Sequence, residues 1–232
     1  MTSTPHEPRL ASVAALIADP ARSRMLCFLL SGDYASAGEL ARAASVTPAT
    51  ASEHLAKLLG AKLVCDERRG RHRYFRLADD DVAHALEAMA LVAERRSHAS
   101  TWASPARSRL RYARCCYGHL AGRLGVELFG HMQDHQWLQP QADGLALTDE
   151  GVAGLGAWGV AIELGAKSKR QAYPCLDWSE RRDHLGGPLA KQVLTQWLEL
   201  GWLRRHAGER ALELSPIGRQ KLGPILPSTN KL

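Results

Sequence analysis

The pattern of apolar and polar positions over residues 36–59 predicts two short helices joined by a tight turn. Ser36 and Glu39 have the spacing of a capping box, so the first helix is expected to begin there. The apolar periodicity then breaks and resumes after Thr47-Pro48. Threonine is a favoured N-cap, and proline suits the first helical position because its missing N–H costs nothing there. These two residues therefore begin the second helix.

The second predicted helix has one apolar face and one small, polar face. Ala51, Leu55 and Leu58 fall at positions i, i+4 and i+7 and form one buried stripe. A helix packed on one side, small on the other and entered through a short turn is typical of a DNA recognition helix. A helical hairpin in some other core is the alternative. The candidate DNA contacts here are Thr47, Thr50, Ser52, Glu53, His54 and Lys57.

A strongly basic hairpin is predicted directly after this helix. Residues 63–69 and 71–77 are strand-like runs that flank a turn at Gly70. Its arginines cannot be core residues. They form either an ordinary solvated charge run or, given the helix before them, a wing placed against DNA phosphates. The candidate phosphate contacts are Arg68, Arg69, Arg71 and Arg73.

Three further helices are predicted around these elements. Residues 10–17 have amphipathic spacing, Asp19-Pro20 is an N-cap followed by proline, and a third helix runs from Asp79 to about Arg96. The apolar positions of the third helix form either a subunit interface or ordinary packing within their own domain. These positions are Val82, Leu86, Met89 and Ala93.

Residues 10–96 resemble the ArsR-type winged helix-turn-helix repressors. The resemblance rests on residues 19–26 (DPARSRML), 50–55 (TASEHL) and 70–77 (GRHRYFRL). It implies a dimeric, mostly bacterial repressor that a metal or another signal releases from DNA. The Cys-x-Cys of the family's metal sensors is absent at residues 35–40, which read ASAGEL. Because the resemblance covers less than half of the chain, it says little about what is sensed.

Composition adds a modest basic charge. The chain of 232 residues has a net charge of +6 and a pI near 9.2, and it is long enough for two small domains. Residues 1–100 carry 13 basic and 12 acidic side chains, so the clustering of arginines, and not the net charge, indicates DNA.

The sequence predicts a cytoplasmic protein. Its five cysteines lack the spacing of a disulfide framework, and it shows no secretory signal and no apolar run long enough to span a membrane. Cys27 and Cys65 have apolar sequence neighbours and are expected to be core residues.

An internal repeat is predicted after a small, polar candidate linker at residues 97–105. HLAGxL at residues 119–124 recurs as HLGGxL at residues 184–189, and the Trp-Leu pair at residues 137–138 recurs at 202–203, both offset by 65 residues. Chance similarity is the alternative. We therefore expect a mainly α fold with small β-hairpins (α+β). A winged helix-turn-helix domain over residues 1–98 would precede a C-terminal domain over residues 99–232, made of two repeated helix–hairpin–helix units.

Reactive side chains gather near the start of each predicted repeat. Three chemistries compete: thiolates activated by nearby arginines, a soft metal or arsenite bound by the thiols of Cys115, Cys116 and Cys175, and an organic anion held by arginines and a tryptophan. In the last case the cysteines only pack. The histidines lack a metal-ligand spacing and adjacent cysteines would point apart, so no metal and no cofactor is assigned. The candidate effector-binding residues are Cys116, His119, Cys175, Trp178, Arg181, Arg182 and His184.

Two other patterns are interpreted without a catalytic role. Gly154-x-Gly156-x-x-Gly159 matches a dinucleotide-binding fingerprint, but it lies within a predicted helix begun at Thr148 and serves close packing there. Four arginines without an acidic neighbour form either a solvated helix face or a second phosphate contact. They are Arg107, Arg109, Arg111 and Arg114.

The sequence thus predicts a DNA-binding transcriptional regulator and no enzyme. A homodimer would bind an inverted-repeat operator in double-stranded DNA and respond, through the C-terminal domain, to a small molecule or a thiol-reactive species. One alternative is a metal or metalloid sensor that uses the C-terminal cysteines. The rival from another class is an enzyme whose N-terminal domain only targets nucleic acid.

Overall fold

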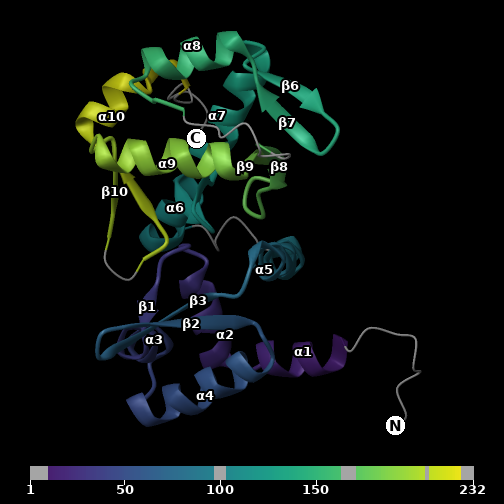
Figure 1. The fold of residues 1–232 in the computed structure, drawn as a ribbon, viewed down its shortest axis with the longest axis vertical. Helices are drawn as coiled ribbons and strands as arrows, with labels where there is room; N and C mark the ends of the chain where they lie inside the picture. Colours follow the sequence, from purple (N-terminus) through teal and green to yellow (C-terminus); the bar gives the residue numbers. More distant parts are fainter. Residues whose placement is uncertain (1–9, 97–102, 163–170, 207–208, 226–232) are drawn as a thin grey trace. The chain divides into compact units, whose positions relative to one another are not determined.

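The computed structural model describes residues 10–96, 103–162, 171–206 and 209–225 (Figure 1). The chain divides into two compact units, residues 1–86 (unit 1) and 87–232 (unit 2). Most of the predicted linker at residues 97–105 lies outside the described residues. Among the helices described, none is long and apolar enough to span a membrane.

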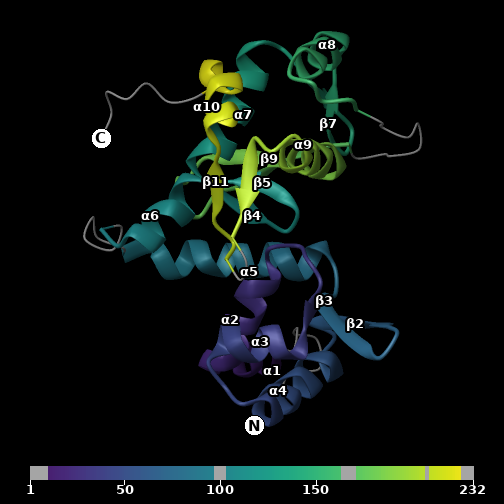
Figure 2. The ribbon, with the colours of Figure 1, turned by 90° about the vertical axis from the view of Figure 1, so that its left-hand side faces the viewer.

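Unit 1 has the element order of a winged helix-turn-helix. Its helices are α1 (Leu10–Ile17), α2 (Pro20–Leu29), α3 (Ala37–Ala44) and α4 (Pro48–Gly60), and α5 (Asp80–Ala93) begins here and continues into unit 2. Its antiparallel sheet has the order β1-β3-β2, with strands β1 (Ala35–Ser36), β2 (Val64–Arg69) and β3 (His72–Leu77). Figure 2 shows the β2–β3 hairpin projecting from the side of this unit.

The predicted starts of α3 and α4 are confirmed. The Glu39 carboxylate accepts a hydrogen bond of 2.8 Å from the Ser36 N–H, and the Ser36 hydroxyl accepts one of 3.3 Å from the Glu39 N–H, which completes the capping box. Thr47 caps α4 by accepting the Thr50 N–H at 3.2 Å, and Pro48 is the first residue of the helix. Local sequence alone therefore fixes the turn between these helices.

The inner faces of these helices form the core of unit 1. As predicted, Ala51, Leu55 and Leu58 of α4 are buried. They pack in a core whose other large, fully buried side chains come from α2, α3 and the sheet. These are Met25, Leu26, Leu29, Leu30, Leu40 and Leu77.

The apolar positions of α1 and α5 divide between core and surface. Leu86 is only 7% exposed, so this member of the predicted interface stripe packs within the chain. Met89 and Val92, by contrast, are 39% and 56% exposed. No residue of α1 is buried, and Leu10 is 71% exposed.

Unit 2 alternates short antiparallel hairpins with helices. Its first part contains α6 (Pro105–Tyr112), β4 (Arg114–Cys116), β5 (His119–Ala121), α7 (Arg123–Asp134), β6 (Leu138–Gln141), β7 (Gly144–Leu147) and α8 (Asp149–Ala157). The second part contains β8 (Tyr173–Leu176), β9 (Asp183–Gly186), α9 (Pro188–Glu199), β10 (Leu203–Arg205), β11 (Leu212–Leu214) and α10 (Pro216–Lys221). The 3₁₀ turns η1 (Glu94–Arg96) and η3 (Gly223–Ile225) flank these elements.

Indole rings line part of the unit 2 core. The ring of Trp137 lies 4.9 Å from that of Trp158, and Trp197 and Trp202 continue the row at centroid distances of 6.1 and 6.0 Å. A Cβ atom at Gly154 would lie 2.1 Å from the Trp137 ring. Gly154 and Gly156 thus lie in α8, and Gly154 permits close packing, whereas Gly159 follows the helix at φ +70°. The interpretation of the fingerprint holds in part.

Backbone contacts bring the hairpins of unit 2 together. One isolated bridge pairs Arg114 at the start of β4 with Ala211 beside β11, and another pairs Leu145 of β7 with Ala172 before β8. Strand β5 also contacts both β9 and α9. The hairpins β4–β5 and β8–β9 therefore lie side by side although about 60 residues separate them in the sequence.

A buried ion pair joins the start of β4 to the β8–β9 connection. The Arg114 Nη2 and Asp177 Oδ2 atoms are 2.9 Å apart, and both side chains are fully buried. Arg114 also donates to the Ser179 hydroxyl at 3.0 Å and lies over the Trp178 ring, 4.4 Å from its centroid. Asp177 Oδ2 accepts the Gly122 N–H at 2.6 Å. Each charge depends on the other because neither is exposed to water.

The surroundings of Asp177 keep its carboxylate ionised. Burial alone would raise the pKa of Asp177, but the Arg114 guanidinium, the Ser179 hydroxyl and His184 together hold it at about 2. The ion pair is therefore fully charged at neutral pH.

Asp177→Asn should lower the free energy of unfolding of unit 2 by about 3–5 kcal/mol, because it leaves the buried Arg114 guanidinium with only the Glu87 carboxylate, 3.8 Å away, as a counter-charge. Urea unfolding followed by tryptophan fluorescence measures this, since all six tryptophans of the chain follow residue 100. The matched control, Asp143→Asn, changes an exposed carboxylate between β6 and β7 and should shift stability by less than about 0.5 kcal/mol. Equal stabilities of the two variants would contradict the importance of the buried pair.

Candidate functional site

The exposed face of α4 carries short polar side chains, as a recognition helix requires. The hydroxyl oxygens of Thr47 and Thr50 are 2.9 Å apart at its N-terminus. The Ser52 hydroxyl donates to the Pro48 carbonyl at 2.9 Å, so its oxygen retains lone pairs for a donor outside the helix. The longer exposed side chains of this helix are Glu53 and Lys57.

His54 differs from the other candidates on α4. Its Nδ1 atom lies 3.3 Å from Arg22 Nη1 and 3.9 Å from the Asp19 carboxylate, and its side chain is 14% exposed. The buried Arg22 guanidinium donates to backbone carbonyls of residues 15 and 16. The geometry gives His54 a part in positioning α4, and its predicted contact with DNA stays a prediction.

Two wing arginines are paired with carboxylates on their own hairpin. Arg69 Nε lies 3.0 Å from Glu67 Oε1, and Arg73 Nε lies 2.6 Å from Asp66 Oδ2. Both arginines are exposed, so these pairs are solvated and contribute little to stability. Such arginines remain available to exchange a carboxylate for a phosphate.

The tip of the wing concentrates positive charge. Arg68 is directly opposite Arg73 across the hairpin. Two like charges in this position repel each other unless an anion lies between them. Gly70 adopts φ +61° in the turn, and the next residue, Arg71, is exposed and contacts His72 Nε2 at 3.3 Å. Neither Arg68 nor Arg71 has a carboxylate partner in the part of the chain that the structure describes.

Two cysteines and two histidines converge in unit 2. Cys116 is opposite His119 in the β4–β5 hairpin, and Cys175 is opposite His184 in the β8–β9 hairpin. Directly opposite residues of an antiparallel pair share one face of the ladder, and the two hairpins lie side by side. The sulfur and nitrogen atoms that the four residues can offer all lie within 4.8 Å of one another. We refer to these residues as the Cys/His cluster.

The Cys/His cluster is sealed from solvent. No member is more than 8% exposed, and the His119 and His184 rings lie 5.2 Å apart at an interplanar angle of 35°. His184 Nδ1 is 3.7 Å from Asp177 Oδ2. Outside the cluster itself, neither ring nitrogen of His184 has a hydrogen-bond partner among the described residues. Buried polar groups are normally hydrogen-bonded, so this histidine requires an explanation.

The two thiols of the cluster change each other's acidity. A hydrogen bond with Cys116 lowers the pKa of Cys175 against the effect of burial, and His184 lowers it further. The same hydrogen bond, together with burial, raises the pKa of Cys116. The thiolate of Cys175 is thus stabilised within the cluster, and not by the arginines expected to do so.

The other three predicted effector-binding residues lie outside the cluster. Trp178 is buried beside the ion pair. Arg181 and Arg182 are exposed in the β8–β9 connection. Arg181 donates to the Glu94 carbonyl at 3.3 Å, and Arg182 Nη1 lies 3.5 Å from the Glu127 carboxylate. The described structure brings together four of the seven candidates and does not line their meeting point with arginines.

The remaining cysteines have separate environments. Cys115 is buried in the apolar core of unit 2, and its sulfur accepts the Gly118 N–H at 3.3 Å. Adjacent residues of a strand point to opposite faces, which separates Cys115 from the cluster. The expectation of core positions is wrong for Cys27, which is exposed, and holds only in part for Cys65. Cys27 lies on the outer face of α2 although its sequence neighbours are apolar.

The arginines around α6 are paired with carboxylates that are distant in the sequence. This excludes the picture of a wholly solvated face. A second phosphate contact stays a prediction, because the exposed arginines among them, like those of the wing, remain available to exchange a carboxylate for a phosphate. The pairs are Arg107 with Glu94 (2.8 Å), Arg109 with Glu209 (3.6 Å), Arg111 with Glu180 (2.6 Å) and Arg114 with Asp177 (2.9 Å).

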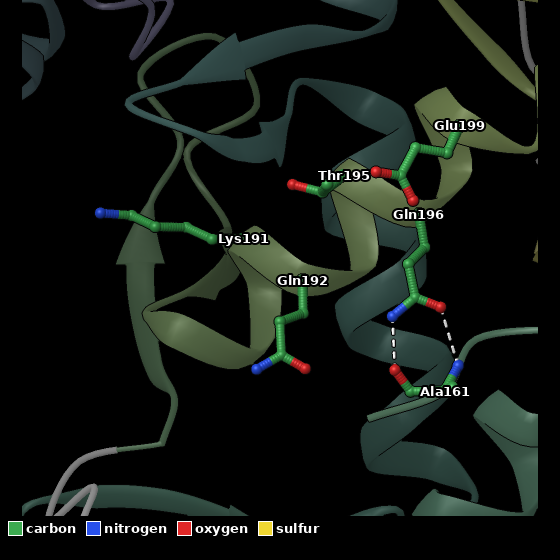
Figure 3. Close-up of a pocket in the computed structure, with 6 residues that line it drawn as sticks. All are labelled: Ala161, Lys191, Gln192, Thr195, Gln196 and Glu199. Atoms are coloured by element: carbon green, nitrogen blue, oxygen red, sulfur yellow. Dashed lines mark hydrogen bonds between the residues drawn. The ribbon is translucent and has the colours of Figure 1, made fainter. Parts of the chain in front are cut away.

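A surface pocket of about 540 Å³ lies beside α9 (Figure 3). The side-chain amide of Gln196 forms hydrogen bonds with both the N–H and the carbonyl of Ala161 there. Its oxygen accepts the Ala161 N–H at 2.8 Å. None of the predicted effector-binding residues lines it, and it offers no cysteine or histidine. Its lining residues are Ala161, Lys191, Gln192, Thr195, Gln196 and Glu199.

Comparison with known proteins identifies the family. A family model described as a helix-turn-helix domain matches residues 17–64. The HTH-type transcriptional regulator YdfF of Bacillus subtilis is 38% identical over 214 residues, which cover 91% of this chain and 94% of that protein. The chain belongs to the HTH-type transcriptional regulators. The family model ends before unit 2, so the Cys/His cluster lies outside the part of this regulator that it matches.

Shorter relatives match about two fifths of this regulator. The HTH-type transcriptional regulator CmtR of Mycobacterium bovis is 37% identical over 86 residues, which cover 37% of this chain and 72% of that protein. Among solved structures, the homodimeric winged helix-turn-helix domain of Mb0332 from Mycobacterium bovis is 26% identical, with a TM-score of 0.35. The matched region covers 41% of this chain and 98% of the Mb0332 domain.

Thiol labelling of the native, reduced regulator should distinguish these environments. Cys27 should react first with an alkylating reagent and Cys65 more slowly, whereas the three buried cysteines should react only after unfolding. Mass spectrometry of proteolytic fragments assigns the labelled residues, and the chain in denaturant, labelled at all five, is the control. Labelling of Cys116 or Cys175 as fast as Cys27 would contradict a sealed cluster.

Proposed function

We propose that this regulator is a cytoplasmic repressor that binds an inverted-repeat operator as a homodimer and responds to a ligand in its C-terminal domain. Residues 1–98 would bind DNA and dimerise, and residues 99–232 would sense the ligand. The observation that carries the DNA-binding part is the short, polar face of α4 followed directly by the basic wing. Two recognition helices of a dimer would enter major grooves about 34 Å apart.

The wing supplies affinity without reading sequence. Its exposed arginines offer guanidinium groups to phosphates, and the opposed Arg68 and Arg73 gain an anion between them. Thr50 and Ser52 on α4 are short enough to approach base edges or phosphates closely, whereas Glu53 either accepts from cytosine or repels phosphate. Affinity and sequence preference therefore reside on different elements.

Exposed apolar side chains support dimerisation. Met89 and Val92 on α5, and Leu10 and Val13 on α1, leave apolar surface in contact with water in the isolated chain. A second copy that covers these side chains would bury that surface. Because Leu86 already packs within the chain, we assign the interface to the outer face of α5 and not to Leu86.

The C-terminal domain suits ligand sensing by a duplicated unit. The order hairpin, helix, hairpin, helix occurs twice along its described part, in agreement with the sequence repeat. Gly122 and Gly187, which are 65 residues apart, precede α7 and α9 with φ of +78° and +95°. The effector would bind where the first hairpins of the two copies meet, at the Cys/His cluster.

Arg71→Ala should weaken binding to every duplex and make the plot of log K against log[salt] less steep by about one unit, because one phosphate contact is lost. Fluorescence anisotropy with a 30-base-pair random-sequence duplex, over a salt series, measures both quantities. Arg109→Ala, which removes an exposed arginine from unit 2, is the control and should match the wild type. An Arg71→Ala variant with wild-type affinity and salt dependence would overturn the wing assignment.

Met89→Glu should convert the dimer to folded monomers, since a carboxylate in an apolar interface costs several kcal/mol and weakens association by about 100-fold or more. Light scattering gives the mass, and circular dichroism checks the fold. Val152→Glu places the same charge on α8, at a residue that is 50% exposed, and should leave the dimer intact. If the second variant dissociates and the first does not, the interface involves α8 and not the outer face of α5.

A further inference from the structure

Neither simple packing nor an organic-anion pocket explains the Cys/His cluster. All four residues are of types that ligate metals, and they meet in a sealed space with their ligand atoms within 4.8 Å of one another. We propose that the cluster binds one divalent ion of the zinc type through two sulfur and two nitrogen atoms. Binding does not depend on DNA, and only its consequence for the operator rests on the proposed function.

The atoms are nearly at the spacing of a tetrahedral site. With zinc–sulfur bonds of about 2.3 Å and zinc–nitrogen bonds of about 2.0–2.1 Å, tetrahedral ligands are about 3.3–3.8 Å from one another. The largest separation in the cluster is thus about 1 Å too long, which side-chain rotation can supply. The cross-strand pairing already places each cysteine with its histidine, so the backbone need not rearrange.

The balance of charge favours a dication. Two thiolates and one divalent ion sum to zero, and the neighbouring buried charges are already paired, Arg114 with Asp177 and Arg210 with Glu87. A neutral centre in neutral surroundings avoids the free energy cost of an isolated buried charge. An organic anion would have no cation within the cluster to meet it.

His184 supplies an independent indication of a ligand. Its ring is fully buried, and among the described residues outside the cluster neither nitrogen has a hydrogen-bond partner. A metal ion on Nε2 would satisfy one nitrogen. Nδ1 faces the Asp177 carboxylate at 3.7 Å, the position of the acidic group that commonly orients a metal-binding histidine. The carboxylate that pairs with Arg114 thus also lies where a metal site needs one.

Four protein ligands complete the tetrahedral coordination of the ion and leave no coordination position for water or substrate. The ion would therefore have a structural or regulatory role and not a hydrolytic one. Because two ligands come from β4–β5 and two from β8–β9, binding would clamp together hairpins that are far apart in sequence. Loss of the ion would remove this clamp, which gives unit 2 two states that metal availability controls.

Zinc titration of the reduced, metal-free full chain, in competition with a chromogenic chelator, tests the proposal. We expect one zinc ion per wild-type chain and an affinity at least 100-fold lower for Cys175→Ser, since even second-sphere changes cost 10–100-fold. Cys115→Ser removes the neighbouring thiol that lies outside the cluster and should retain one zinc ion. Cobalt replacement in the wild type gives a second reading that needs no variant, because tetrahedral thiolate coordination produces intense visible absorption.

Two results would overturn the metal site: no zinc uptake and no such cobalt spectrum from the reduced wild type, or equal zinc affinity in the Cys175→Ser and Cys115→Ser chains. The DNA titration described for Arg71→Ala, run on the same preparations, separates the two proposals. A chain that binds DNA through the wing but takes up no zinc retains the proposed function and loses the metal site. A chain that takes up zinc but binds no duplex retains the site and loses the proposed function.

Discussion

The buried pair of Arg114 and Asp177 is the constraint on which the organisation of unit 2 depends. It connects the strand that carries Cys116 to the connection that follows Cys175, and both of its side chains are excluded from water. The carboxylate also receives the Gly122 N–H directly before α7. One interaction therefore fixes two hairpins and the start of a helix, which is why four side chains from distant segments can meet with little freedom.

This constraint also explains the character of the Cys/His cluster. Two buried histidines and two buried thiols would be costly if the hairpins could separate and rejoin in many registers. The ion pair connects β4 to the β8–β9 connection, and Asp177 faces both Arg114 and His184. Unit 1 depends on different interactions. Capping hydrogen bonds and packing against an apolar core hold α4 in place, while the wing remains charged and exposed. The two units thus suit different tasks, one a solvated surface for a polyanion and the other a sealed interior for a small ligand.

Much of unit 1 could be predicted because its signals are local. The capping box of Ser36, the Thr47-Pro48 start and the stripe of α4 each lie within a few residues, and all three are confirmed. The outer position of Cys27 could not be predicted, because an apolar sequence neighbourhood does not say which face of α2 a residue takes. For α5, periodicity identified an apolar stripe but not which of its members pack within the chain.

The Cys/His cluster was predicted only in part. Its four members were named, but Trp178, Arg181 and Arg182, which were expected beside them, lie outside the cluster. The spacing between cysteine and histidine differs between the hairpins, so no metal-binding motif is visible in the sequence, and only strand register makes each pair adjacent. Arg114 belonged to a run of arginines that looks solvated in sequence, whereas its partner is 63 residues away. Long-range pairing of this kind leaves no local pattern.

The central claim is that the two hairpins converge on one centre with two sulfur and two nitrogen ligands. X-ray absorption at the zinc edge of the zinc-loaded full chain tests this directly, because it measures the number, type and distance of the bound atoms. We expect two sulfur atoms at about 2.3 Å and two nitrogen atoms at about 2.0–2.1 Å. A first shell made only of oxygen and nitrogen atoms, or one with a single sulfur atom, would contradict it.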